Sequence, residues 1–596
     1  MTFERNGSEW AVEGSWYRLS GTVDGPVARL ADADGRSWAE LRLLASLDTR
    51  DGADETFTVT GPDPATVVGG AAEAVTRLTW ALTGSRWAAK RLVLDAAATT
   101  VTAYIEVEGR GALTEVSLLA GRVVQPRASG MLMSGAWFES VVSAAPADPS
   151  RIVQPASESS VIGVVSGAEP GRGRWFFTPA PFVVAAARAV ATSPSDVPDG
   201  PWLVFAVDAT AGNALFTEVA YRAMDRGFAF VLDYDGQTVV DGTWRSPPLV
   251  IATAPDPFTA VADQQRRLEH VAPARRPATV GWWREPMFCG WGAQSALVAG
   301  RGLPMSAAPS VATAASYDAF LDHLEAHGVV PGTIVVDDKW QLTYGGNEPD
   351  AAKWPDLRGW IAARRRRRQR VLLWYKAWDP EGLPDEWCVR SAAGTAIAID
   401  PTNPDAEAAI RQAVRTMIGP DGLDADGLKI DFTARTPSGR ATVHHGPEWG
   451  VDLLGRLLGI VADEAHSLKP DALLIGHAPN HAIASSLDMI RLNDALRLDD
   501  PAPAADVVTQ MRFRAGIVRA ACPDHLIDTD DWCMPDLAGW RAYTAVKAQL
   551  GVPALYYATG IDRTGEAFEE RDYELIRTVW ADYRQAAGLP PRRASD

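Results

Sequence analysis

Cysteine, lysine and histidine are scarce in this sequence of 596 residues. Four cysteines without a CxxC pair exclude a disulfide scaffold and a cysteine-based zinc site, and they fit a reducing, cytoplasmic compartment. No run approaches the roughly 18 consecutive apolar residues of a membrane span, and the start, MTFERNGSEW, lacks the layout of a signal peptide. The 57 basic and 75 acidic residues give a net charge of −18, which argues against a nucleic-acid partner.

The scarce reactive side chains are distributed unevenly along the chain. All nine histidines lie at or after His270, all four cysteines lie at or after Cys289, and only Lys90 among the seven lysines precedes Lys339. The first 269 residues therefore lack most of the groups that perform chemistry near neutral pH. We expect the functional site in the second half of the chain.

The pattern of apolar residues divides the chain into two domains. Residues 1–270 carry short β-branched and aromatic runs separated by turn residues, which predict an all-β sandwich domain. The Pro/Arg-rich stretch 271–279 is the expected linker. Residues 280–596 alternate short apolar runs with helical patterns, which predicts a (β/α)8 TIM-type barrel followed by no C-terminal β domain.

Eight runs are the expected barrel strands: 285–291, 333–338, 370–376, 427–432, 472–477, 487–494, 525–531 and 553–559. A doubly wound open sheet is the competing interpretation. It would be favoured by a Gly-rich phosphate loop after the first strand, and neither GxGxxG nor GxxxxGK[ST] occurs there. We expect no cofactor.

Carboxylates and lysines gather at the ends of these expected strands, where a barrel places its chemistry. The carboxylates are Asp337, Asp338, Asp431, Asp494, Asp528, Asp530 and Asp531, and the lysines are Lys339, Lys376 and Lys429. Cleavage of a glycosidic bond needs an acid that protonates the leaving oxygen and a second carboxylate opposite it. Lys429, two residues before Asp431 on the same side of the strand, would favour an ionised nucleophile at Asp431. Asp494 follows a mostly apolar run, where desolvation would suit it to proton donation.

The strings VVDDKWQ, LKIDF, MIRLND and DPTNPD, in a barrel behind a long β domain, resemble clan D α-glycosidases. The likeness is greatest to glycoside hydrolase family 36, the α-galactosidases and raffinose-synthase-like enzymes. That resemblance implies that Asp431 is the nucleophile and Asp494 the acid/base. The sequence departs from the family at Lys339, which replaces a glycine, and at Lys376, which replaces an acidic residue. It also departs at residues 491–493 and at the GHAPNH string of the fifth strand end.

The leading hypothesis is a retaining α-glycoside hydrolase that cleaves a terminal α-linked, galactoside-like sugar of an oligosaccharide or glycoside. The expected substrate-binding residues lie at or near the strand ends, and tryptophans among them could stack on sugar rings: Asp337, Asp338, Lys429, Trp340, Trp291, Lys376, Trp374, Arg491, His477 and Asp530.

Three alternatives stay open at the level of sequence. A transglycosidase would use the same Asp pair. A metal-dependent barrel lyase, isomerase or hydrolase would use His477 and His481, whereas the leading hypothesis needs no metal. A catalytically silent sugar-binding protein would require Asp431 or Asp494 to be dispensable. The sequence decides neither whether the chain forms a homo-oligomer nor whether the loop with His444 and His445 covers the pocket.

Overall fold

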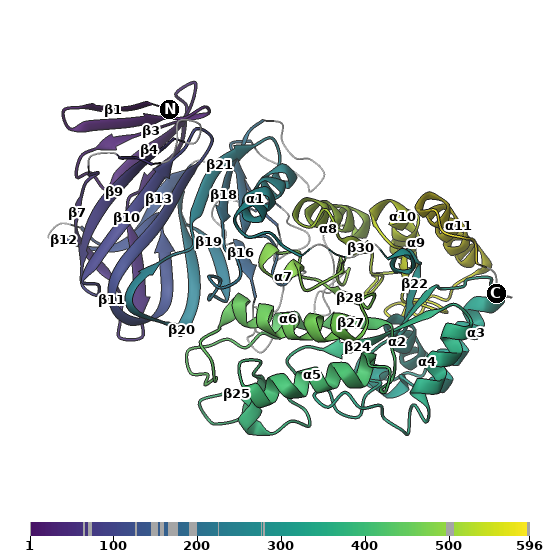
Figure 1. The fold of residues 1–596 in the computed structure, drawn as a ribbon. Coiled ribbons are helices and arrows are strands. Elements are labelled where there is room, and N and C mark those ends of the chain that lie inside the picture. The colour runs from purple at the N-terminus through teal and green to yellow at the C-terminus, as the bar shows by residue number, and fades with distance from the viewer. Residues whose placement is uncertain are drawn as a thin grey trace.

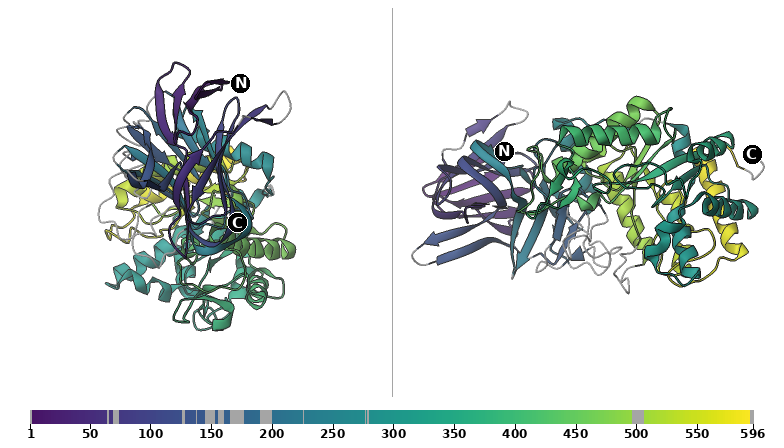
Figure 2. Two further views of the ribbon diagram at one scale, coloured as in Figure 1. Left: turned by 90° about the vertical axis from the view of Figure 1, so that its left-hand side faces the viewer. Right: turned by 90° about the horizontal axis from the view of Figure 1, so that it is seen from below.

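The computed structural model describes most of the chain. The parts outside the description are Met1 and residues 64–65, 69–73, 126–127, 137, 145–152, 155–159, 165–176, 190–199, 225, 276, 278–279, 496–505 and 593–596. The described residues form a β domain that lies beside a mixed helix and strand domain, with the N-terminus in the first and the C-terminal end at the far side of the second (Figures 1 and 2).

The described residues of the first domain form 21 hydrogen-bonded strands, nearly all antiparallel. They are β1 (Thr2–Asn6), β2 (Glu9–Glu13), β3 (Tyr17–Thr22), β4 (Val27–Asp32), β5 (Ser37–Arg42), β6 (Ala45–Thr49), β7 (Glu55–Thr60), β8 (Thr66–Val68), β9 (Val75–Gly84), β10 (Ala89–Ala96), β11 (Val101–Leu118), β12 (Ala120–Gln125), β13 (Ala128–Ala136), β14 (Ser140–Ser143), β15 (Val153–Gln154), β16 (Ser160–Gly163), β17 (Val183–Ala187), β18 (Trp202–Val207), β19 (Glu218–Met224), β20 (Gly227–Arg245) and β21 (Leu249–Ala254).

Burial along these strands shows which side faces the core. In β9 buried and partly exposed positions alternate, as in a strand with one solvated face. Every residue of β18 is buried, so both of its faces are covered. Helix α1 (Pro257–Val271) packs on β17, β18 and β21 and also on α8 (Val507–Ala521) of the second domain. The β domain predicted over residues 1–270 therefore ends in a helix, which lies at the junction with the second domain.

The second domain is built on an eight-stranded parallel sheet in the order β30-β29-β28-β27-β24-β23-β22-β31. Its strands are β22 (Met287–Cys289), β23 (Thr333–Val336), β24 (Arg370–Lys376), β27 (Gly427–Asp431), β28 (Leu473–Gly476), β29 (Met489–Arg491), β30 (Leu526–Asp528) and β31 (Ala554–Leu555). A single parallel bridge between Asp528 and Val552 joins the two ends of the sheet and nearly closes the barrel. Each of the eight predicted runs contains one of these strands.

Helices follow most strands and cover the outside of the sheet. They are α2 (Gly290–Gly300), α3 (Ala314–Ala326), α4 (Leu357–Arg366), α5 (Pro404–Ile418), α6 (Gly450–Leu468), α7 (His481–Ala484), α9 (Leu537–Thr544), α10 (Lys547–Leu550) and α11 (Glu570–Ala587), with a hairpin of β25 (Cys388–Arg390) and β26 (Ala396–Ile399) after β24. Close packing between β27 and β28 leaves no room for a side chain at residue 427. A Cβ at Gly427 would collide with the Leu473 carbonyl oxygen of β28. No helix in the described part of the chain is long and apolar enough to cross a bilayer.

Candidate active site

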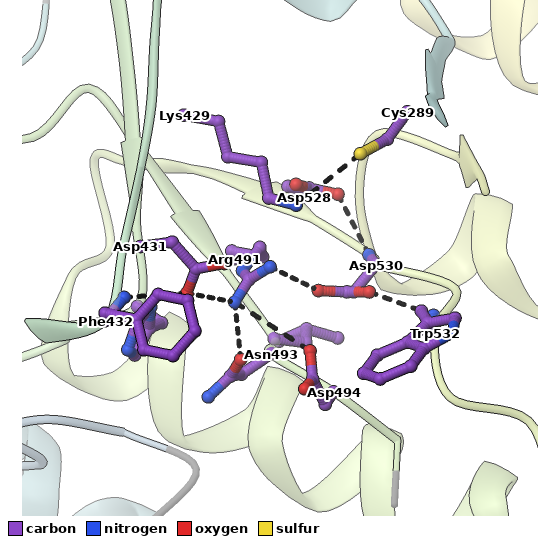
Figure 3. A network of polar contacts seen from close by, with 12 residues as sticks. Cys289, Lys429, Asp431, Phe432, Arg491, Asn493, Asp494, Asp528, Asp530 and Trp532 are labelled. Carbon is purple, nitrogen blue, oxygen red and sulfur yellow. Dashed lines mark hydrogen bonds and ion pairs between the residues drawn. The ribbon is translucent and has the colours of Figure 1, made fainter. Parts of the chain in front are cut away.

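The register of the barrel strands brings the predicted residues to one place. Within β24 and β27, Trp374 lies opposite Lys429 and Lys376 opposite Asp431. Because side chains alternate along a strand, Lys429 and Asp431 point to the same side. Figure 3 shows Lys429, Asp431 and Arg491 of β29 converging with residues that follow β29 and β30. The carboxyl ends of the strands therefore form one polar centre, as in other barrels of this type.

Asp431 ends β27 and accepts three hydrogen bonds. The donors to its carboxylate are the Phe432 amide at 2.9 Å, the Trp374 indole at 3.2 Å and the Arg491 guanidinium at 3.2 Å. Burial alone would raise the pKa of Asp431, but the charges of Arg491 and then Lys429 outweigh it and hold the pKa below the usual range. About a fifth of the side chain, 21%, is exposed. Asp431 is thus an ionised, accessible carboxylate.

Arg491 contacts several carboxylates of the site and is itself almost fully buried, at 2% exposure. Its Nη2 lies 3.2 Å from Asp431 Oδ1, 2.6 Å from Asn493 Oδ1 and 3.9 Å from Asp494 Oδ1. Its Nη1 lies 3.3 Å from Asp530 Oδ2. Figure 3 shows the guanidinium between these oxygens. One cation therefore holds three carboxylates in a fixed arrangement.

Asp494, three residues after Arg491, has the opposite electrostatic character to Asp431. Burial raises its pKa to about 7, and the neighbouring negative charges of Asp530 and Asp431 add to this rise against the opposing charge of Arg491. Its side chain is 36% exposed. A carboxyl that is protonated near neutral pH and still accessible can donate a proton.

A second ion pair lies deeper in the barrel. Lys429 Nζ is 2.8 Å from Asp337 Oδ2, and the Cys289 thiol donates to the same oxygen at 3.0 Å. Burial raises the pKa of Cys289, and the charge of Asp337 raises it further, so the thiol stays protonated. Lys429 is predicted to favour the ionised form of Asp431. It forms its ion pair with Asp337, and its charge still lowers the pKa of Asp431.

Asp338 is the more accessible member of the Asp337–Asp338 pair. The Tyr344 hydroxyl donates to Asp338 Oδ1 at 2.8 Å, and the Tyr344 ring carries the Lys376 ammonium 3.8 Å from its centroid. Lys376 also pairs with Asp379 at 2.7 Å. Burial raises the pKa of Asp338 to about 6. Asp338, Tyr344 and Lys376 form one polar wall.

The predicted tryptophans have different surroundings. Trp340 has no exposed surface, and its indole donates to the Trp374 carbonyl at 2.8 Å, so it supports Trp374 from the core and offers no ring to a sugar. Trp374 is 1% exposed and donates to the Asp431 carboxylate. Trp291 is partly exposed and packs edge-on against Trp532, with ring centroids 5.8 Å apart. Of these three predicted substrate-binding tryptophans, only Trp291 is partly exposed.

The two histidines proposed as metal ligands do not share a site. His477 lies at the end of β28, where its Nε2 is 2.9 Å from Thr433 Oγ1, and burial lowers its pKa to about 4. His481 has both ring nitrogens engaged elsewhere, by Gln265 at 3.2 Å and by the Ala272 carbonyl at 2.7 Å. Among the described residues no three His, Cys, Asp or Glu side chains gather as metal ligands. His444 stacks on Trp449 with centroids 4.7 Å apart.

Three non-glycine residues beside the site adopt left-handed backbone conformations. They are Phe432 with φ 60°, Asn493 with φ 67° and Asp530 with φ 53°. Such conformations are costly for residues with a Cβ and persist where the surroundings fix them, often at functional sites. Phe432 follows Asp431 and Asn493 precedes Asp494, so both candidate carboxylates stand next to a constrained residue.

Several site residues carry no clear signal in the sequence. Tyr344 lies in a turn-rich loop, and nothing in its neighbours indicates a contact with Asp338. Cys289 lies within the first predicted strand, 285–291, and ends the observed β22. Thr433 contacts His477 across two strands, a pairing that only the barrel order reveals.

Comparison with known proteins shows the same two-domain fold in glycosidases. No protein-family model matches the chain, and no curated protein matches its sequence. A GH31 family sulfoquinovosidase from E. rectale superposes with a TM-score of 0.58 at 11% identity, over 99% of this chain and 83% of that one. A GH36 α-galactosidase from Geobacillus stearothermophilus gives 0.53 at 13% identity, over 98% and 86%. The α-galactosidase from Lactobacillus brevis gives 0.50 at 10%, over 97% and 83%. At these low sequence identities, the superpositions establish a shared fold alone.

Proposed function

We propose that this chain is a retaining α-glycosidase, with Asp431 as the nucleophile and Asp494 as the acid/base. One observation carries the proposal. The same nitrogen of Arg491 lies 3.2 Å from an oxygen of Asp431 and 3.9 Å from an oxygen of Asp494. These two oxygens are therefore at most about 7 Å apart, so the two carboxylates are close neighbours, and this bound accommodates the roughly 5–5.5 Å separation of retaining enzymes.

The opposite pKa shifts of the two carboxyls support different roles for them. In the first step the ionised Asp431 attacks the anomeric carbon, and Asp494 gives its proton to the leaving oxygen as the glycosidic bond breaks. The product is a glycosyl ester on Asp431. In the second step the ionised Asp494 takes a proton from water, which displaces Asp431 and releases the sugar. Two inversions give net retention.

The residues around the two carboxylates support recognition of a polar ring. Asp338 would accept hydrogen bonds from hydroxyls remote from the reacting carbon, and charge-assisted bonds of this kind are about twice as strong as neutral ones. Terminal α-galactosides are the first candidate substrates, because solved enzymes of this fold include α-galactosidases. A sulfoquinovoside is the second, since the fold also occurs in a sulfoquinovosidase. Transfer to an acceptor hydroxyl would use the same two carboxylates.

A panel of aryl α-glycosides, including the galactoside, glucoside and sulfoquinovoside, tests this function. NMR of the first product should show the α-anomer, and a first-formed β-anomer would refute the retaining mechanism. Asp431→Ala should abolish turnover because no glycosyl ester can form, whereas the exposed Asp34→Ala serves as a control that keeps it. Products with added sugar acceptors would separate transglycosylation from hydrolysis.

A further inference from the structure

A segment of the β domain is buried against the catalytic centre of the barrel. Residues 177–187 have little or no exposed surface. The Thr178 amide donates to the His477 carbonyl at 3.1 Å, and the Asn480 side chain donates to the Ala180 carbonyl at 2.7 Å. Both partners lie at the end of β28. The contact is therefore made at the rim that carries the candidate active site.

The side chain of Thr178 extends this contact to the strand of the candidate nucleophile. Its hydroxyl is hydrogen-bonded to the hydroxyl of Thr433, which in turn lies 2.9 Å from His477 Nε2. Thr178 is 0% exposed, Thr433 1% and His477 3%. A buried hydroxyl that loses its partner cannot turn to water, so this chain of three groups has a strong preference for its present geometry.

Thr433 stands two residues after Asp431, and the residue between them is under constraint. Phe432 has φ 60°, and its amide donates to Asp431 Oδ1 at 2.9 Å. A residue with a Cβ keeps a left-handed conformation only where the surrounding structure fixes it. The hydrogen bonds of Thr433 supply such a fixed point immediately after Phe432.

We infer that Thr178 of the β domain is a positioning residue for the nucleophile: through Thr433 it holds Phe432 and thereby the Asp431 carboxylate in the attacking orientation. This inference rests on the proposed function. It assigns the β domain a part in the reaction rate, although the domain contains none of the reacting carboxylates. Small displacements of a positioned group can cost about 100-fold in rate, so loss of this contact should be visible in kinetics.

The test compares Thr178→Val, which removes the hydroxyl at nearly constant shape, with Thr178→Ser, which keeps it. Readouts are kcat, KM and the rate of covalent labelling by a 5-fluoro-α-glycosyl fluoride of the sugar hydrolysed in the panel. Thr178→Val should lower kcat and the labelling rate about ten-fold or more with KM nearly unchanged. Thr178→Ser should retain most of the activity. Thr56→Val is the control, because it removes a buried β-domain hydroxyl that bonds Lys90 at 2.9 Å within that domain.

A second variant keeps the inference testable if the Thr178→Val protein does not fold. Thr433→Val removes the same hydrogen bond from the barrel side, and the double variant should lose no more than the larger single loss, because coupled residues are not additive. Wild-type labelling on Asp431 with an unchanged rate in Thr178→Val would overturn the inference and leave the proposed function standing, whatever Thr433→Val does, because that variant also loses the contact with His477. Wild-type protein that neither turns over nor becomes labelled would overturn both.

Discussion

Arg491 holds one positive charge within 3.9 Å of three carboxylates, and its removal should change the pH dependence of the reaction. At the 3.2 Å separation from Asp431, two unit charges at an effective dielectric constant of about 20 interact by about 5 kcal/mol. That energy corresponds to between about 3 and 4 pKa units. Because the Asp431 side chain is 21% exposed, water will replace part of the lost charge. We expect Arg491→Met to raise the pKa of Asp431 by about 2 units or more.

The direction of the effect on rate follows from the role of the nucleophile. Asp431 must be ionised to attack, so kcat/KM falls as the pH drops through its pKa, and a raised pKa moves this acid limb to higher pH. The assay is kcat/KM for the best aryl α-glycoside between pH 3 and pH 9, with Arg491→Lys as the matched variant that keeps the charge. Circular dichroism controls for folding, since Asp530 would lose its buried partner. An acid limb that stays in place in folded Arg491→Met would refute the electrostatic reasoning.

The barrel could be predicted from the sequence because each strand is a short apolar run that ends in polar residues. The predicted runs 427–432 and 370–376 match the bounds of β27 and β24 to within one residue. The helix α1 was missed because its residues 257–271 follow a long β region, and only Asp256 and Pro257 mark its start. The Asp256 side chain accepts the Phe258 and Thr259 amides there, which is an ordinary helix cap.

The sequence predicts which residues gather at the candidate site, but it does not predict which of their side chains bind each other. Strand ends converge in any barrel, so Asp431, Asp337 and Arg491 could be gathered from the sequence alone. Which cation meets which carboxylate depends on register and on side-chain length. Lys429, only two residues before Asp431, binds Asp337, whereas Arg491, two strands away, binds Asp431.

Contacts between the two domains could not be predicted from the sequence. Thr178 is 255 residues from Thr433, and neither lies in a motif. Their pairing is set by how residues 177–187 pack against the end of β28, which is a property of the folded domains together. A local pattern cannot encode such a contact, and this explains why the β domain was assigned no role at the sequence level.

Three further results are expected. Asp494→Ala should cleave an activated aryl α-glycoside far better than a natural glycoside, and azide should restore turnover and yield the α-glycosyl azide; equal losses on both substrates would move the acid/base role to another carboxylate. Because burial raises the pKa of Asp494 to about 7 and the acid must be protonated, kcat/KM should fall as the pH rises through about 7. The last concerns stability: in the β domain, Lys90 Nζ and Asp54 Oδ2 pair at 2.7 Å with side chains only 1% and 0% exposed. Asp54→Ala leaves a buried ammonium without its carboxylate and should lower the free energy of unfolding of this domain by about 3–5 kcal/mol. Glu115→Ala, which removes the partly exposed partner of the more exposed Arg222, is the control and should cost no more than about 1 kcal/mol. Urea unfolding followed by tryptophan fluorescence measures both, and equal losses would show that burial of the Lys90 pair does not determine its contribution.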